Sequence, residues 1–131
     1  MDDFSSKPGH PNSFGLIGSE ANSVEANKRM LSSMTPTIVL KNKKPSLIVG
    51  TPGGSTIITS VFQTILNVYE FNMSMQEAVN APRVHHQWLP DVVIIEKDGI
   101  DSVQDSILRS KNYFVVSLPI VSDGPNIRAR S

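Results

Sequence analysis

The sequence predicts a domain of mixed strands and helices, of the α/β or α+β class. Two short β-branched runs, residues 37–40 and 46–49, flank the turn-forming segment 42–45 and indicate a hairpin. Apolar residues then recur at helical spacing over residues 57–69, and another β-branched run follows at 92–96. Because both kinds of element occur in a chain of 131 residues, which suits one hydrophobic core, we expect one mixed domain.

Two helices are predicted in the central part of the chain. Ser55 is the expected N-cap of the first, because its hydroxyl can accept from the free amides of the first turn. The apolar face of this helix comprises Ile57, Ile58, Val61, Phe62, Ile65, Leu66 and Tyr69. The second helix is expected to start at Ser74, which has the capping-box spacing to Glu77, and to stop before Pro82.

The last third of the chain predicts a strand, a helix and a further strand. The strand at 92–96 is expected to turn at residues 97–99, after which Asp101 caps a third helix. Residues 113–118 predict another strand and residues 126–130 the start of one more. The apolar face of the third helix comprises Val103, Ile107 and Leu108.

Composition excludes several classes of function. Twelve basic residues balance twelve acidic ones, so the overall charge favours neither nucleic acid nor an anionic membrane. No apolar run approaches the roughly 20 residues that span a bilayer, and the start lacks the pattern of a signal peptide. The absence of cysteine removes disulfides, thiolate catalysis and zinc–cysteine sites. Adjacent His85 and His86 are a poor metal pair because their side chains diverge, and no cofactor is implied.

The glycine-rich segment 50–55 is the most informative local feature, because it lies between a predicted strand and a predicted helix. Gly53 and Gly54 permit a tight turn and leave the peptide amides uncovered by side chains. Amides beside a helix N-terminus favour an anion or a developing oxyanion. The alternative is a turn that merely needs glycine. The segment matches neither a Walker-type nucleotide loop nor the dinucleotide fingerprint.

Other candidate residues lie in or near residues 1–36, which hold few hydrophobic residues and are expected to be loops. Ser32 and Ser33 supply hydroxyls that bind a carboxylate or satisfy the loop's own backbone. Asp3 is either a solvated terminal residue or a counter-ion for an ammonium group. No histidine stands at an obvious position to activate a serine. Trp88 is expected to be buried against the core.

Several of these segments, in this order, resemble the small subunit of γ-glutamyltranspeptidase. The resemblance covers almost the whole chain and weakens after about Asp123. The segments that carry it are Met-Asp-Asp-Phe at 1–4, Pro8-Gly9, Pro11-Asn12, residues 28–37, the glycine-rich segment 50–55, Glu-Ala-Val-Asn-Ala-Pro-Arg at 77–83 and His-Gln-Trp-Leu-Pro-Asp at 86–91. So many long motifs occurring together are far more specific than any one of them.

The resemblance implies a fold and a reaction. The fold is the N-terminal-nucleophile hydrolase type, a four-layer αββα sandwich of the α+β class, of which this chain is a part. A proenzyme cleaves itself, and the new N-terminal threonine attacks the γ-glutamyl amide of glutathione. The γ-glutamyl ester then passes to water or to an amino-acid acceptor. Residues 1–131 are the C-terminal portion of the small subunit, with substrate-site loops at 1–36 and the sheet and helices at 37–131.

Matching positions carry over the family's site roles. Asp3 resembles the aspartate that receives the glutamyl α-ammonium group, and Ser32 and Ser33 resemble the pair that binds the α-carboxylate. Gly53 and Gly54 resemble the oxyanion-hole glycines. Each role agrees with the chemistry read directly from the residues: a carboxylate for a cation, hydroxyls for an anion and bare amides for an oxyanion.

The chain also departs from the family pattern. The threonine nucleophile lies upstream of the segment that begins here at Met1, which is expected to be an internal methionine. The arginine that pairs with the α-carboxylate belongs to the large subunit, and the final strand is expected to be truncated. We therefore expect the isolated chain to be inactive, prone to associate and dependent on the large subunit and the upstream segment. The family's habit of export implies a periplasmic or extracellular protein. The alternative is a non-catalytic module that binds an amino acid or a small anion.

Overall fold

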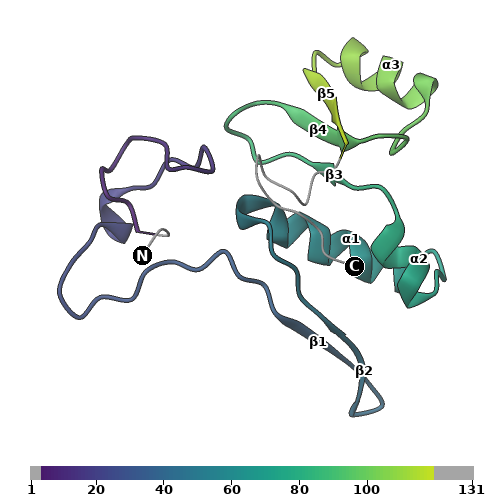
Figure 1. The fold of residues 1–131 in the computed structure, drawn as a ribbon, viewed down its shortest axis with the longest axis horizontal. Coiled ribbons are helices and arrows are strands. Elements are labelled where there is room, and N and C mark those ends of the chain that lie inside the picture. Colours follow the sequence, from purple (N-terminus) through teal and green to yellow (C-terminus); the bar gives the residue numbers. More distant parts are fainter. Residues whose placement is uncertain (1–3, 120–131) are drawn as a thin grey trace.

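The protein is described here from a computed structural model that places residues 4–119. Residues 4–36 form a lobe of loops, here called the N-terminal lobe, set apart from a body of strands and helices (Figure 1). The elements in chain order are η1 (Glu20–Asn22), β1 (Thr37–Lys41), β2 (Lys44–Val49), η2 (Gly54–Thr56), α1 (Ile57–Tyr69), α2 (Met75–Asn80), β3 (Val84–His85), β4 (Val93–Glu96), α3 (Ser102–Ser110) and β5 (Val115–Leu118).

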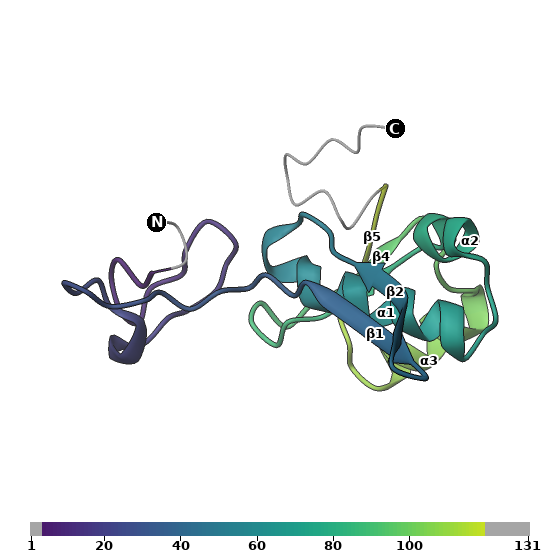
Figure 2. The same ribbon diagram turned by 90° about the horizontal axis from the view of Figure 1, so that it is seen from below.

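The predicted hairpin is confirmed. Strands β1 and β2 pair antiparallel (Figure 2), and the Tyr69 hydroxyl of α1 donates to the Ser46 hydroxyl of β2 at 2.8 Å. The turn is tighter than predicted: it consists of Asn42 and Lys43, both with left-handed φ angles, of 52° and 62°. Pro45 therefore belongs to β2, where it lies opposite Leu40 at a shift in the register. Pro has no N–H to donate, which suits a two-stranded ladder with free edges.

Helix α1 confirms the predicted helix but not its predicted cap. Ser55 lies inside the short 3₁₀ turn η2, and no side chain makes a capping bond at the start of α1, so the prediction for Ser55 is wrong. The 3₁₀ turn leads directly into the helix and takes the place of a capped start. Ile57 and Val61 are buried, whereas Ile58 and Phe62 are 54% and 58% exposed. The apolar face is thus wider than the surface that covers it.

Helix α2 begins and ends as predicted. The Ser74 hydroxyl accepts from the Glu77 N–H, and the Glu77 carboxylate accepts from the Ser74 N–H at 2.8 Å, which completes the capping box. The helix ends before Pro82, with Ala81 as its extended C-cap.

The capping box makes the first turn of α2 sensitive to acid. Hydrogen bonds from the Ser74 hydroxyl and then from the Ser74 backbone hold the pKa of Glu77 below its ordinary value. A lowered carboxyl pKa gives stability that is present above the ordinary value and is lost as the pH falls through the folded value. We expect amide exchange at Ala78, corrected for intrinsic rates, to accelerate over that interval. Glu77→Gln should remove this pH dependence, and its persistence in the variant would contradict the assignment.

The second sheet has the order β3-β4-β5 and holds the hydrophobic core cluster. Strand β4 pairs antiparallel with β3 and parallel with β5. The buried residues of this cluster are Val93, Ile95 and Val115. The predictions of strands at 92–96 and 113–118 are confirmed within one or two residues, whereas β3 was not predicted. The strand expected at 126–130 lies outside the described residues.

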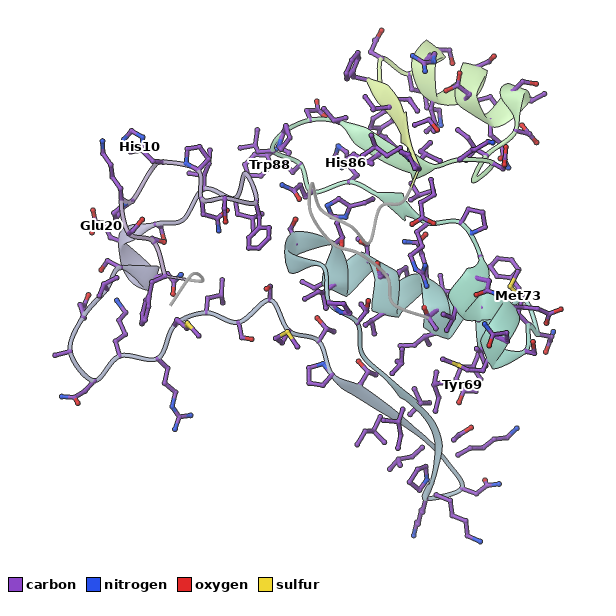
Figure 3. The ribbon with its side chains drawn as sticks, viewed as in Figure 1. His10, Glu20, Tyr69, Met73, His86 and Trp88 are labelled. Atoms are coloured by element: carbon purple, nitrogen blue, oxygen red, sulfur yellow. The ribbon has the colours of Figure 1, made fainter. Side chains whose placement is uncertain are left out.

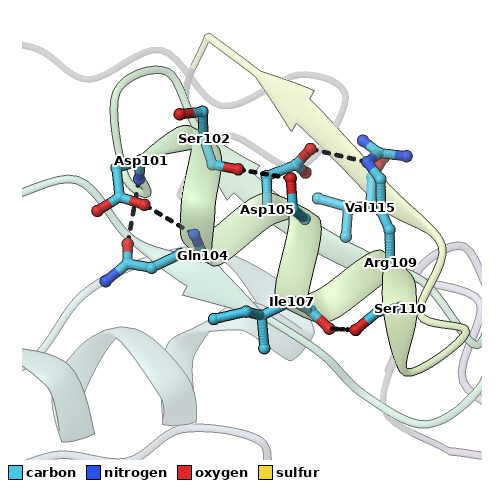
Figure 4. Close-up of polar contacts among 9 residues, drawn as sticks. Asp101, Ser102, Gln104, Asp105, Ile107, Arg109, Ser110 and Val115 are labelled. Atoms are coloured by element: carbon cyan, nitrogen blue, oxygen red, sulfur yellow. Dashed lines mark hydrogen bonds and ion pairs between the residues drawn. The ribbon is translucent and has the colours of Figure 1, made fainter.

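Helix α3 crosses over between the two parallel strands. Asp101 caps it as predicted, in a second capping box with Gln104 (Figure 4). Arg109 bonds Asp105 at 2.8 Å on the same helix and donates to the Val115 carbonyl oxygen, which fixes the helix to β5. The predicted apolar face is only partly right: Leu108 packs on the core, but Val103 and Ile107 are 64% and 49% exposed.

Two further features concern the connection after α2. The Gln63 amide pairs with both backbone groups of Val84, accepting from the N–H and donating to the carbonyl, and so extends the polar pairing of β3 onto α1. Trp88 is 75% exposed, so its predicted burial is wrong. It follows β3 in a loop with a left-handed φ of 69°.

None of the helices within residues 4–119 has the length and apolar character needed to cross a membrane.

Candidate active site

The glycine turn is shaped by two left-handed residues. Gly53 has φ 139° and Gly54 has φ 57°, conformations that residues with a Cβ rarely adopt. The Gly53 carbonyl accepts from both the N–H and the hydroxyl of Thr56, at 3.1 and 2.9 Å, and these bonds anchor the turn to the start of α1. Within residues 4–119, the N–H groups of Gly53 and Gly54 have no hydrogen-bond acceptor. Two unpaired donors at a helix start can receive an anion.

A side chain from the N-terminal lobe packs on this turn. A Cβ added to Gly54 would lie 2.5 Å from Cε1 of Phe14, closer than real Cβ contacts. Gly54 is therefore required for close packing as well as for its φ angle. The interpretation as a turn that merely needs glycine and the interpretation as an oxyanion site are both compatible with this contact.

A chain of polar side chains leads from α1 to the same part of the lobe. The Thr59 hydroxyl lies 2.9 Å from Nδ1 of buried His85, whose Nε2 lies 2.9 Å from Oε1 of Gln87. The Gln87 amide nitrogen donates to the Phe14 carbonyl oxygen at 3.2 Å and to the Leu89 carbonyl oxygen at 2.9 Å. These bonds bring the segment after β3 against Phe14.

The two serines are placed differently. The Ser32 hydroxyl accepts from the Met34 N–H at 3.2 Å and so satisfies the loop's own backbone. Ser33 is half-buried and lines a cavity of about 490 Å³ between the N-terminal lobe and the Trp88 loop. Figure 3 labels Trp88 on the side of the body that faces the lobe. Gly53 and Gly54 do not line this cavity. The N-terminal lobe thus carries Ser33 and contacts the glycine turn through Phe14, but Ser33 and the turn do not share one cavity.

Among the described residues, the other candidates add no further ligand group. Asp3 lies outside the described residues. The side chains of His85 and His86 turn to different partners, since His86 bonds Asp91 at 3.0 Å. Over residues 4–119, no group of three His, Asp or Glu side chains is arranged to hold a metal ion.

Sequence reasoning missed four residues of this region. Phe14 and Thr59 were not singled out, and His85 and Gln87 were considered only within a segment expected to be a packing, hydrogen-bonding loop rather than a catalytic centre, with His85 also weighed as a metal ligand. The bond from Gln87 to Phe14 joins residues 73 positions apart. No local pattern indicates such a contact, because neither spacing nor composition relates the two segments.

Comparison with known proteins identifies the family. The family profile of gamma-glutamyltranspeptidase matches residues 1–120. The chain belongs to the γ-glutamyltranspeptidase family. Over 97 residues, 74% of this chain, it is 58% identical to the glutathione hydrolase proenzyme of Escherichia coli. Over 90 residues, 69% of this chain, it is 60% identical to the glutathione hydrolase proenzyme of Pseudomonas aeruginosa. These matches cover only 17% and 16% of the two curated relatives.

A solved γ-glutamyltranspeptidase confirms the fold. The structure of the T380A mutant of the Helicobacter pylori enzyme aligns with a TM-score of 0.87 and 57% identity, covering 92% of this chain and 64% of that one. The α+β fold predicted by resemblance, part of an N-terminal-nucleophile type αββα sandwich, is therefore confirmed. This γ-glutamyltranspeptidase chain spans less than two thirds of its solved relative and about a sixth of its curated relatives.

Proposed function

We propose that this chain supplies the oxyanion hole and the glutamyl pocket of a γ-glutamyltransferase that hydrolyses or transfers the γ-glutamyl group of glutathione and related amides. The observation that carries the proposal is that the N–H groups of Gly53 and Gly54, at the start of α1, have no acceptor among residues 4–119. Names and structures of the relatives support the substrate class: they are glutathione hydrolases and γ-glutamyltranspeptidases.

In this reaction the glycine turn acts when negative charge develops on the carbonyl oxygen of the substrate. A threonine hydroxyl oxygen attacks the γ-carbonyl carbon, its proton passes to a base, and the carbonyl oxygen becomes an oxyanion. The N–H groups of Gly53 and Gly54 donate to that oxygen, which favours the transition state over the substrate. The carbon–nitrogen bond then breaks, the amine leaves with a proton, and a γ-glutamyl ester remains. Water or an amino-acid amine attacks the ester and releases the threonine.

The remaining pocket roles follow the family resemblance. Ser32 and Ser33 hold the α-carboxylate of the glutamyl group, and Asp3 receives its α-ammonium group. The position of Ser33 in the wall of the 490 Å³ cavity supports its role. The bond from Met34 to Ser32 uses one acceptor lone pair and leaves the Ser32 hydroxyl hydrogen for a carboxylate.

The proposal requires two partners: the upstream segment that carries the threonine, and the large subunit. Exposed apolar side chains on several elements support burial against further protein, because a folded soluble protein rarely leaves so many uncovered. The largest exposures on the hairpin and α1 are those of Ile38, Leu40, Ile48 and Phe62, each at least 58%. Without partners we expect the chain to associate and to lack activity. By family resemblance, the complete protein acts in the periplasm or outside the cell.

A segment exchange tests the proposal. The segment of the E. coli proenzyme that corresponds to residues 1–120 of this chain, the range that the family profile matches, is replaced by those residues, and release of p-nitroaniline from a γ-glutamyl anilide is measured. We expect the exchanged enzyme to retain activity within about tenfold of the parent, because the pocket residues are supplied intact. The isolated chain, purified from a host lacking the enzyme, should release none.

Two outcomes would contradict the proposal. A processed, folded but inactive exchanged enzyme would show that the segment does not provide the pocket. Activity of the isolated chain would show that the nucleophile lies within it. Calorimetric titration of the isolated chain with glutamate covers the alternative: strong heat together with an inactive exchanged enzyme would favour a non-catalytic binding module.

A further inference from the structure

The Gln87 side chain makes hydrogen bonds in two directions. Its Oε1 lies 2.9 Å from Nε2 of His85, and its Nε2 donates to the carbonyl oxygens of Phe14 and Leu89. Two carbonyl acceptors place the amide nitrogen on that side, so the acceptor Oε1 faces Nε2 of His85. The orientation of the Gln87 amide is thus set by its partners on the lobe side.

These bonds connect the body to the N-terminal lobe at one point. On the body side, buried His85 is bonded to Thr59 of α1, which begins directly after the glycine turn. On the lobe side, the accepting carbonyl belongs to Phe14, whose ring packs on Gly54. Gly15, the next residue, approaches the same loop: a Cβ there would lie 3.7 Å from Nε2 of Gln87.

We propose that Gln87 is a positioning residue that holds the Phe14 backbone so that the lobe is seated against the glycine turn. The inference rests on the proposed function, because seating the lobe sets the distance between the Ser33 wall and the donors at Gly53 and Gly54. Gln87 lines the same cavity as Ser33, but within residues 4–119 no hydrogen bond joins its side chain to Ser33, Gly53 or Gly54. It acts through Phe14.

Hydrogen exchange on the full chain tests the seating without requiring activity. Gln87→Glu preserves the side-chain length and the acceptor for His85 but removes both N–H donors and places a carboxylate beside two carbonyl oxygens. We expect at least threefold faster exchange in peptides covering residues 12–18 and 50–56, with unchanged exchange in β1 and β2. Gln76→Glu is the matched control, because Gln76 is exposed on α2 and its side chain, among residues 4–119, bonds only Asn80. It should leave all these peptides unchanged.

Kinetics of the segment-exchanged enzyme separate positioning from a general structural role. We expect Gln87→Glu to raise KM for the γ-glutamyl anilide at least fivefold while the thermal midpoint stays within about 2 °C. A merely structural role would lower the midpoint and leave KM of the folded enzyme unchanged. Phe14→Leu should raise KM as well, and the double variant should be less than additive, because both changes loosen the same contact.

The results that would overturn the inference are specific. Unchanged exchange over residues 12–18 in Gln87→Glu would show that the lobe is held by other contacts. Unchanged KM, or strict additivity with Phe14→Leu, would show that Gln87 does not act through Phe14. If the segment-exchanged enzyme with Gln87 in place is inactive, the proposed function fails. The hydrogen-exchange experiment on the full chain still decides whether Gln87 seats the lobe.

Discussion

Gly54→Ala in the segment-exchanged enzyme is expected to reduce kcat by on the order of 100-fold or more. The added Cβ would lie 2.5 Å from the Phe14 ring, and the φ of 57° disfavours any residue with a side chain. The turn must shift, which moves its donors away from the developing oxyanion. Loss of one such donor costs about 3–4 kcal/mol of transition-state stabilisation. Steady-state kinetics with the γ-glutamyl anilide measures the effect.

Gly50→Ala is the matched control for this substitution. Gly50 lies four positions earlier in the same glycine-rich segment, has no left-handed φ, and a Cβ there meets no atom within 4 Å. The same change in composition should therefore leave kcat within about twofold. Equal losses in Gly50→Ala and Gly54→Ala would show that the segment is sensitive to any added side chain, and would remove the specific role given to Gly54.

Gln63→Ala is expected to lower the free energy of unfolding of the chain by about 2–3 kcal/mol. The Gln63 amide satisfies the N–H and the carbonyl of Val84, at 2.9 and 2.7 Å, and also donates to the Thr59 carbonyl. Truncation leaves the part-buried backbone groups of β3 unpaired, and each such group costs about 1–3 kcal/mol when water does not replace the partner. Denaturant titration followed by circular dichroism measures the difference.

Gln76→Ala provides the comparison for that measurement. Gln76 is exposed on α2, and in the part of the chain that the structure describes its side chain makes one bond, to Asn80, so its loss should change the free energy of unfolding by less than about 0.5 kcal/mol. If Gln63→Ala were equally mild, the pairing between α1 and β3 would contribute little, and the attachment of the second sheet to α1 would rest on other contacts.

The predictable parts of this fold are those with local causes. Ser74 was identified as a cap by its spacing to Glu77 and Asp101 by its place before the third helix, and both form capping boxes. The hairpin was predicted from two β-branched runs and a turn. In each case, the residues that decide the structure are neighbours in the sequence, and the energetic preference acts within one turn or one strand pair.

Except for Ser55, the failures have non-local causes. Ser55 has the chemistry of an N-cap, but the glycines before it start a 3₁₀ turn that already contains it. Trp88 has the composition of a core residue, yet it follows the short strand β3 in a loop facing the lobe. Val103 and Ile107 have helical spacing, but only Leu108 meets the sheet. Periodicity identifies an apolar face and does not say whether another element covers it.

The candidate site likewise has a part that the sequence predicts and a part that it does not. Within the described residues, the N–H groups of Gly53 and Gly54 have no acceptor, as expected for a glycine pair at the start of a helix, which the sequence displays directly. The packing of Phe14 on Gly54 and the bond from Gln87 to Phe14 depend on segments that are 40 and 73 residues apart. Only the folded structure brings these segments together.

Inhibitor affinity measures the role of the glycine amides most directly. A tetrahedral boronate analogue of the γ-glutamyl group mimics the oxyanion stage, whereas glutamate mimics only the bound group, and both can be titrated against the segment-exchanged enzyme. If the twin-glycine N–H groups stabilise that stage, Gly54→Ala will weaken boronate binding at least 100-fold and glutamate binding less than threefold. Equal weakening of both ligands, or retention of boronate affinity, would contradict the assignment.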